Sequence, residues 1–396
     1  MINHTSVAAG LRGLALATLL AAISTLAPAQ ETEFRIGAVG TLSGPFGVLG
    51  ESIRKGAELA AEMRGNKVLG VPIKFVWEDD ETKPQVAVQK ATRLISGGAQ
   101  MLLAPVSSGS TLAVMKLVER SKMPLLVTLS AGDDITGKDK NPYTFRTSNS
   151  ADMGTRMMAA AAHAAGVKKI YIACMDYSAG REAMKILRSR LEGYGIVVVA
   201  EEYYAIGTKD YSVLVNKMLQ SDADGVVSAF GGNDAINFFK QADEVGLQRK
   251  KAIFGDIVMD ELIAAAVGQA SLGVNSTMRY HFSTDNAANR AFVKAYRAKF
   301  NEFPDQYAGE AFDGVGWFLD VVDSTKSWDK ERWLKAFRTS VRSNSVEGAK
   351  RMRSCDNQAE QSALMGKAVT GGGDLPPITM KITQRFDVSQ LFKPCP

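Results

Sequence analysis

The sequence predicts an α/β protein with two Rossmann-like lobes joined by a hinge of several chain crossings. From Phe34 onward, short runs of β-forming residues alternate with longer amphipathic stretches, as in parallel sheets with crossover helices. The same alternation occurs twice, in a first series that ends near Arg146 and a second that begins near Asp152. We therefore expect two open sheets, each covered by helices, that face one another.

The first residues are typical of a secretory signal peptide. Arg12 supplies a positive charge, residues 13–26 are dominated by Leu and Ala, and residues 27–29 are Ala-Pro-Ala, which fits the cleavage pattern. The apolar run is too short to cross a bilayer comfortably, and a buried N-terminal helix is disfavoured because Pro28 and charged residues follow it. We therefore expect residues 1–29 to be removed during secretion.

The first series is expected to form one lobe. A helix that follows the first strand places Ile53, Ala57, Ala60 and Ala61 on one face. The other expected elements are strands at 34–39, 73–77, 100–104 and 125–129, helices at 85–95 and 111–120, and an extended segment at 143–146.

The second series repeats this architecture with different residues. We expect helices at 152–165, 181–194, 211–220 and 235–245, strands at 169–174, 197–203, 224–229 and 252–254, and an extended passage at 274–281.

The remaining sequence decides how the two lobes are assembled. Three helices, at 289–300, 308–323 and 330–341, have no strands between them, and we expect them to return to the first lobe, which has few helices of its own. A last strand is expected at 378–386. Lobe 1 is thus predicted to contain residues 30–147 and 283–342, and lobe 2 with the hinge to contain residues 148–282 and 343–396.

Composition and charge exclude some classes of function. The net charge is +5 with both signs interspersed, which is not typical of a nucleic-acid-binding surface. No Gly-x-Ser-x-Gly elbow, phosphate-binding Gly-x-x-x-x-Gly-Lys loop, dinucleotide fingerprint or metal-spaced His/Cys cluster occurs. We expect no enzyme activity, no cofactor and no metal. A hydrolase that uses a pair of acids would escape this search for motifs.

The three cysteines have different surroundings. Cys174 lies in an apolar run that predicts a buried strand, so we expect it to be a small core residue. Cys355 and Cys395 both lie in irregular C-terminal sequence, and in an oxidising compartment they are the expected disulfide.

Polar loops that follow predicted strands are the candidate ligand site of the first lobe. Ser107 and Ser108 follow a strand and open a helix, where unpaired N–H groups, the helix dipole and hydroxyl donors favour a bound carboxylate. The alternative is that one of these serines only caps its own helix. The loop of Ser130, Ala131 and Gly132 also follows a strand, and this repetition favours the functional interpretation.

Three loops of the second lobe are expected to face this set across a cleft. Tyr177 and Phe230 are candidates to contact an apolar or aromatic ligand body, and Asp256 is a candidate to bind an ammonium group. The alternatives are that Asp256 caps the next helix and that Phe230 belongs to the core.

These loops resemble, as a set and in order, those of the periplasmic leucine/isoleucine/valine-binding proteins of ABC importers. The resemblance covers nearly the whole chain after the signal peptide. The segments that carry it are 34–50, 78–80 with 84–91, 107–111, Asp176 and Tyr177 with Gly180, 209–211 and 304–308.

The resemblance implies a type I periplasmic binding protein fold, whose two lobes are joined by three crossover strands and close on the ligand. It implies that Ser107, Ser108 and the turn of residues 130–132 hold a ligand carboxylate, and that loops at Ala179, Gly231 and Asp256 hold an amino group and flank the side chain. The tyrosines usual in that family at the positions of Leu49, Ala179 and Gly231 are missing here. This difference argues against a branched-chain amino acid and favours another carboxylate, such as an aromatic one, or an amide.

The resulting hypothesis is a monomeric, periplasmic substrate-binding protein. We expect it to capture a small amino acid or other carboxylate or amide solute by hinge closure. It would then deliver the solute to an ABC permease in the inner membrane. Two alternatives stay open, namely a sensor of the same fold that passes its ligand to a regulator or receptor, and a secreted α/β enzyme.

Overall fold

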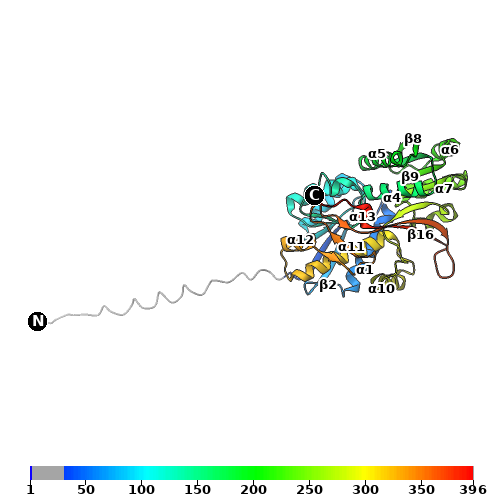
Figure 1. Ribbon diagram of the computed structural model, residues 1–396. Helices are drawn as coiled ribbons and strands as arrows, with labels where there is room; N and C mark the ends of the chain where they lie inside the picture. The colour runs from blue at the N-terminus through cyan, green and yellow to red at the C-terminus, as the bar shows by residue number, and fades with distance from the viewer. Residues whose placement is uncertain (2–30, 396) are drawn as a thin grey trace. The chain divides into compact units, whose positions relative to one another are not determined.

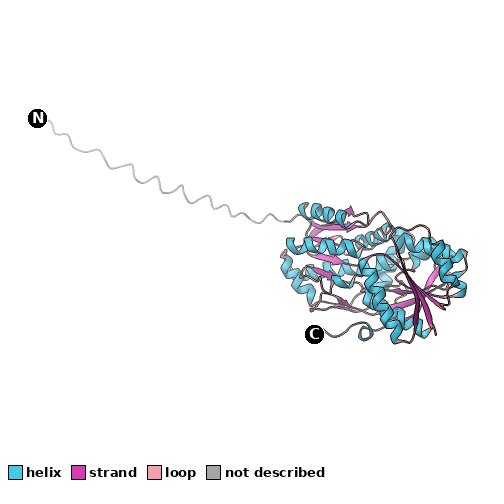
Figure 2. Ribbon diagram, turned by 90° about the horizontal axis from the view of Figure 1, so that it is seen from above, coloured by secondary structure: helices cyan, strands magenta, loops and turns pink. Residues whose placement is uncertain are grey.

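The computed structural model describes Met1 and residues 31–395. Apart from Met1, the predicted signal peptide lies outside the described residues. Two large sheets, each with helices on both sides, form two lobes, which confirms the predicted α/β class (Figures 1 and 2). The elements labelled α4 to α7 gather in one lobe, and α1, β2, α11 and α12 gather in the other.

The first sheet has the strand order β2-β3-β1-β4-β5-β6. Its strands are β1 (Phe34–Gly40), β2 (Lys67–Val68), β3 (Val71–Asp79), β4 (Met101–Leu103), β5 (Leu125–Val127) and β6 (Thr144–Arg146). All neighbours are parallel except β2 and β3. The loops after β1, β4 and β5 therefore meet at one edge of the sheet.

The second sheet has the order β16-β15-β11-β10-β9-β7-β8. Its strands are β7 (Lys169–Met175), β8 (Val197–Tyr204), β9 (Gly225–Ala229), β10 (Ala252–Asp256), β11 (Asn275–Met278), β15 (Ala363–Thr370) and β16 (Ile378–Phe386). The pairs from β8 to β11 are parallel, and β15 and β16 add an antiparallel edge. The loops after β7, β9 and β10 meet at the same edge.

Helices cover the sheets because each buries an apolar face on the strands. Those among the first-sheet strands are α1 (Gly47–Met63), α2 (Pro84–Ser96), α3 (Ser108–Ser121) and the 3₁₀ turn η1 (Asp133–Ile135). Those among the second-sheet strands are α4 (Ala151–Ala164), α5 (Ser178–Gly193), α6 (Ser212–Gln220), α7 (Gly232–Glu244), α8 (Leu247–Lys250), α9 (Glu261–Val267) and the 3₁₀ turn η2 (Gly268–Ser271).

Three helices after β11 pack with the first lobe. They are α10 (Ala287–Phe300), α11 (Gln306–Thr325) and α12 (Lys330–Arg338). α11 lies so close to α1 that a Cβ placed on Gly56 would come within 2.1 Å of the Ala308 carbonyl oxygen. On α12, Trp333 is buried with its ring centroid 5.5 Å from that of Phe34 in β1. Because glycine has no Cβ, position 56 allows α1 and α11 to pack closely in this lobe.

The C-terminal region differs from the prediction in several short elements. The third of these helices ends at Arg338 and not at residue 341, because Val341–Arg342 forms a strand, β12, that pairs with β13 (Lys350–Met352). β14 (Ala359–Glu360) completes this small sheet, and α13 (Val388–Leu391) follows β16. α9, β15 and α13 were not predicted, and β16 matches the expected last strand.

The chain crosses between the lobes after β6, after β11 and between β14 and β15. Buried polar groups tie the first and third crossings together. Arg146 donates to the Gly132 carbonyl oxygen (2.7 Å) and to Gln358 Oε1 (2.5 Å), and burial lowers its pKa to about 10. Lys350 Nζ lies 3.2 Å from the Thr147 carbonyl oxygen. These contacts fix how the crossings pass one another.

A disulfide joins Cys355, in the third crossing, to Cys395 at the end of the tail, with 6.0 Å between the Cα atoms. Arg353 supports the same junction by donating to the Lys393 carbonyl oxygen at 2.6 Å. Within residues 31–395, no helix has the length and apolarity that crossing a membrane requires.

Candidate functional site

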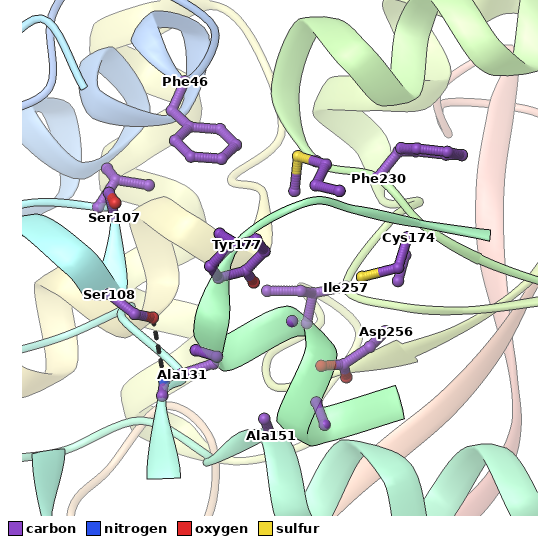
Figure 3. A pocket seen from close by; sticks show the side chains of 18 of the residues that line it. Phe46, Ser107, Ser108, Ala131, Ala151, Cys174, Tyr177, Phe230, Asp256 and Ile257 are labelled. Carbon is purple, nitrogen blue, oxygen red and sulfur yellow. Dashed lines mark hydrogen bonds between the residues drawn. The ribbon is translucent and has the colours of Figure 1, made fainter. Parts of the chain in front are cut away.

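A cavity lies where the strand-end loops of the two lobes meet. It encloses about 880 Å³ with its open mouth included, and its lining comes from both sheets (Figure 3). All but one of the predicted ligand residues line it, namely Leu49, Ser107, Ser108, Ala131, Gly132, Tyr177, Ala179, Phe230, Gly231 and Asp256. Loops more than two hundred residues apart in sequence are thus brought together by the parallel order of both sheets.

The loop before α3 forms what we call the anion end of the cavity, made by Ser107, Ser108 and Gly132. Ser107 is the N-cap residue of α3, but its side chain makes no capping hydrogen bond. Ser108 Oγ accepts from the Gly132 N–H at 3.0 Å, marked by the dashed line in Figure 3, so the Ser108 hydroxyl proton remains free to donate. With the first N–H groups of α3, these hydroxyls can bind an anion through neutral donors.

Ser130 is the exception among the predicted residues, because its side chain does not line the cavity. Its buried Oγ lies 2.7 Å from the Pro105 carbonyl oxygen and 2.6 Å from Thr111 Oγ1. The hydroxyl is therefore used to hold the loop after β4. Ser130 thus supports the loop beside the anion end, and it lies outside the cavity lining.

On the opposite side, Tyr177, Asp256 and Thr277 form what we call the acceptor end. Thr277 Oγ1 donates to Asp256 Oδ1 at 2.5 Å and accepts from the Ile257 N–H at 2.9 Å. Ile257 has φ +50°, a conformation that costs a β-branched residue about 1–3 kcal/mol. This turn directs Asp256 toward the cavity. Burial raises the pKa of Asp256, and the nearby charge of Arg279 partly offsets that rise.

Most of the remaining lining is apolar. Phe230 lines the cavity, but the residue is only 1% exposed and its ring centroid lies 4.8 Å from that of Tyr211, so it also belongs to the core. Cys174 is buried in β7, as expected, yet it also lines the cavity, and burial raises its pKa to about 12. The thiol therefore stays protonated and serves as an apolar surface.

Sequence reasoning missed several lining residues. Phe46, Met184, Ile206, Ile257 and Tyr307 also line the cavity. Two of them carried a usable signal, since Phe46 lies in the loop after β1 and Ile257 directly follows Asp256 at the end of β10. The others come from a helix face, a helix start and a loop far from any predicted binding turn.

The two lobes touch around the cavity. The Asn233 N–H, at the start of α7, donates to the Pro45 carbonyl oxygen of the first lobe at 3.0 Å. The Tyr307 hydroxyl donates to the Ile257 carbonyl oxygen at 3.1 Å. A Cβ placed on Gly132 would lie 3.7 Å from Ala179 Cβ of the other lobe. A solute in this cavity therefore contacts both lobes at once.

No histidine is among the described residues that line the cavity. His163 stacks on Tyr194 with ring centroids 4.7 Å apart, and His281 Nε2 lies 3.1 Å from Glu261 Oε1 away from the cavity lining. Among residues 31–395 no group of three or more His, Cys, Asp or Glu side chains is placed to hold a metal ion.

The fold and the cavity define a two-lobed solute-binding protein. Residues 33–373 match the family model described as periplasmic binding protein, and the chain belongs to that family. It is similar to Leu/Ile/Val-binding protein homolog 6 of Brucella melitensis biotype 1, with 27% identity over 320 residues that cover 78% of this chain and 80% of that protein. The resemblance noted in the sequence is thereby confirmed.

Solved structures give the same fold. An ABC transporter solute-binding protein from Rhodopseudomonas palustris, in complex with benzoate, is 26% identical with a TM-score of 0.82 and covers 89% of this chain and 96% of that one. Another, from Rhodopseudomonas palustris BisB5 in complex with 3,4-dihydroxybenzoic acid, is 23% identical with a TM-score of 0.84 and covers 90% and 98%. The latter likeness shows the fold alone.

Proposed function

We propose that this periplasmic solute-binding protein captures an aromatic carboxylate between its lobes and delivers it to an ABC permease in the inner membrane. The observation that carries the proposal is a cavity with unpaired neutral donors at one end and largely apolar walls. We also propose that it acts as a monomer after cleavage of residues 1–29.

The anion end supports a carboxylate as the common feature of the solute. No Lys or Arg is among the described residues that line the cavity, so the donors are hydroxyls and backbone N–H groups at the start of α3. Such a site binds an anion reversibly without a buried counter-charge. A solute that must later be released to a permease suits this arrangement.

The shape of the walls supports a flat, apolar body. Ala131, Gly132, Ala179 and Gly231 contribute little side-chain volume, and Phe46 supplies an aromatic ring that lies 3.4 Å from a Cβ placed on Gly231. Flat rings gain dispersion and burial energy in such a space. The similar Rhodopseudomonas palustris protein solved with benzoate points to the same class of solute.

The two lobes close on each other because only a bound solute can contact both ends of the cavity. Because the anion end lies on the first lobe and the acceptor end on the second, a solute that binds both favours the closed arrangement by its differential affinity. The absence of a His or Lys among the described lining residues supports a binding role without catalysis.

A thermal-shift screen of the purified mature protein tests the proposal. A ligand of the folded state at a hundred times its Kd stabilises the protein by about 2.7 kcal/mol, so the correct class stands out. We expect benzoate-type carboxylates to raise the melting temperature, and leucine, benzamide and succinate to leave it unchanged. A response to leucine with none to the aromatic carboxylates would refute the aromatic assignment.

A further inference from the structure

The acceptor end contains two polar groups that the proposed function does not yet explain. Thr277 occupies Asp256 Oδ1, while Oδ2 has no hydrogen-bond partner among the described residues. Tyr177 also lines the cavity, and its hydroxyl likewise has no hydrogen-bond partner in the described part of the chain. Figure 3 shows Asp256 across the cavity from Ser107 and Ser108, with Tyr177 between them.

The position of Asp256 is built into the fold and is not a chance rotamer. Its carboxylate rests on the backbone of α4 at Gly154, where an added Cβ would lie 2.2 Å from Oδ1 and 2.7 Å from Oδ2. Thr277 fixes one oxygen, and the left-handed turn at Ile257 sets the direction of the strand end. Such support fixes the carboxylate at the cavity wall and leaves Oδ2 without a partner among the described residues.

We propose that Asp256 and Tyr177 make the protein selective for a solute that carries a neutral hydroxyl group opposite its carboxylate. This inference rests on the proposed function. The solute hydroxyl donates to Asp256 Oδ2 and accepts from the Tyr177 hydroxyl, which satisfies both protein groups together. The substrate class is then a hydroxylated aromatic carboxylate.

A neutral hydroxyl fits better than an ammonium group because of the number of partners each needs. An ammonium has three donors and accepts nothing, whereas a hydroxyl donates one hydrogen bond and accepts others. Cys174 and Ile257 lie beside Asp256 in Figure 3, and neither side chain offers a strong acceptor. An ammonium here would keep unsatisfied donors in an apolar space.

The test compares four probes on the purified mature protein by isothermal titration calorimetry: benzoate, 3-hydroxybenzoate, 4-hydroxybenzoate and 4-(aminomethyl)benzoate. We expect at least one hydroxybenzoate to bind about tenfold or more tightly than benzoate, since a hydrogen bond to a charged acceptor has that effect. The ammonium probe should bind more weakly than benzoate.

Two variants assign this selectivity to the acceptor end. Asp256→Asn turns an N–H toward the cavity, and Tyr177→Phe removes the hydroxyl, so each should reduce the hydroxybenzoate-to-benzoate affinity ratio about five- to tenfold. Asp222→Asn, an exposed carboxylate paired with Lys169, is the matched control and should keep the wild-type ratio.

The outcomes separate the two proposals. If benzoate binds and neither hydroxybenzoate binds more tightly, the hydroxyl selectivity is refuted while the proposed function stands. A ratio that survives in Asp256→Asn refutes the role of Asp256. If none of the four probes binds, both proposals fail.

Discussion

The two ends of the cavity carry opposite hydrogen-bonding groups, with donors at the anion end and a carboxylate acceptor at the other. At the anion end, Ser108 Oγ already accepts from the Gly132 N–H, which fixes the oxygen and leaves the hydroxyl proton free to donate to a solute. At the acceptor end, a carboxylate with a pKa raised by burial lies within apolar lining. On the proposed assignment, an ionised Asp256 would repel a second carboxylate and so favour one orientation of the solute. We therefore propose that the first lobe recognises the carboxylate that its solutes share and that the second lobe distinguishes among them.

The largest expected effect is on the stability of the protein and not on either end of the cavity. Replacing Cys355 and Cys395 by Ser should lower the free energy of unfolding by about 3–4 kcal/mol, because the loop closed over 40 residues is released. Urea unfolding measures this loss. The hydroxybenzoate-to-benzoate ratio of the folded variant should stay unchanged, and a changed ratio would show that the tail shapes the cavity.

Removing the donors of the anion end should affect every carboxylate alike. The double change Ser107→Ala and Ser108→Ala should weaken binding by about 1–3 kcal/mol for both benzoate and its hydroxylated forms. Ser121→Ala, at the other end of α3 where the hydroxyl donates to the Leu117 carbonyl oxygen, is the control. Titration calorimetry that finds wild-type affinity in the double variant would remove this loop as the anchor.

A methyl group beneath Asp256 should damage the acceptor end alone. Gly154→Ala places a Cβ 2.2 Å from Asp256 Oδ1 and pushes the carboxylate off its support, so hydroxybenzoate affinity should fall about tenfold. Gly193→Ala on α5 is the control, since a Cβ there meets no atom within 4 Å. If Gly154→Ala lowers benzoate affinity as much as that of its hydroxylated forms, the two ends are not independent.

The smallest expected effect is on the stability of the protein without a bound solute. The pKa of Asp256 is raised on folding, so its stabilising influence is present below the ordinary value of 3.8 and is lost as pH rises through the raised pKa. At neutral pH the raised pKa of this carboxyl group therefore lowers stability. Asp256→Asn should raise the free energy of unfolding by about 1 kcal/mol there.

Melting temperatures of this variant and the wild type measure the gain, which should shrink near about pH 4. Asp222→Asn serves again as the control, because an ion pair with Lys169 lowers the pKa of that exposed group. A constant difference between Asp256→Asn and the wild type across this pH range would show that the carboxylate is not the source of the effect.

The strand-end loops were predictable because a parallel sheet brings the carboxyl ends of its strands to one edge. That rule sufficed for Ser107, Gly231 and Asp256, which lie in the cavity although they come from different lobes. It could not show that the Ser130 hydroxyl turns back to the Pro105 carbonyl oxygen, 25 residues away in sequence. That direction depends on loop packing and not on local pattern.

Other features that the sequence did not predict also depend on tertiary packing. Cys174 lies in an apolar run that predicts burial, and nothing in that run shows that one side chain of a buried strand reaches a cavity. The short strands β12 to β14 have too few residues for a detectable period, and tertiary pairing forms them. The left-handed turn at Ile257 contradicts the local preference of a β-branched residue, so only the surrounding fold explains it.

A crystal structure of the protein with 4-hydroxybenzoate would show whether the two ends of the cavity bind the solute as proposed. We expect the carboxylate oxygens within about 3 Å of Ser108 Oγ and the N–H groups that open α3, with the hydroxyl oxygen at a similar distance from Asp256 Oδ2. A reversed solute, with its carboxylate toward Asp256, or a solute bound outside the cavity, would contradict it.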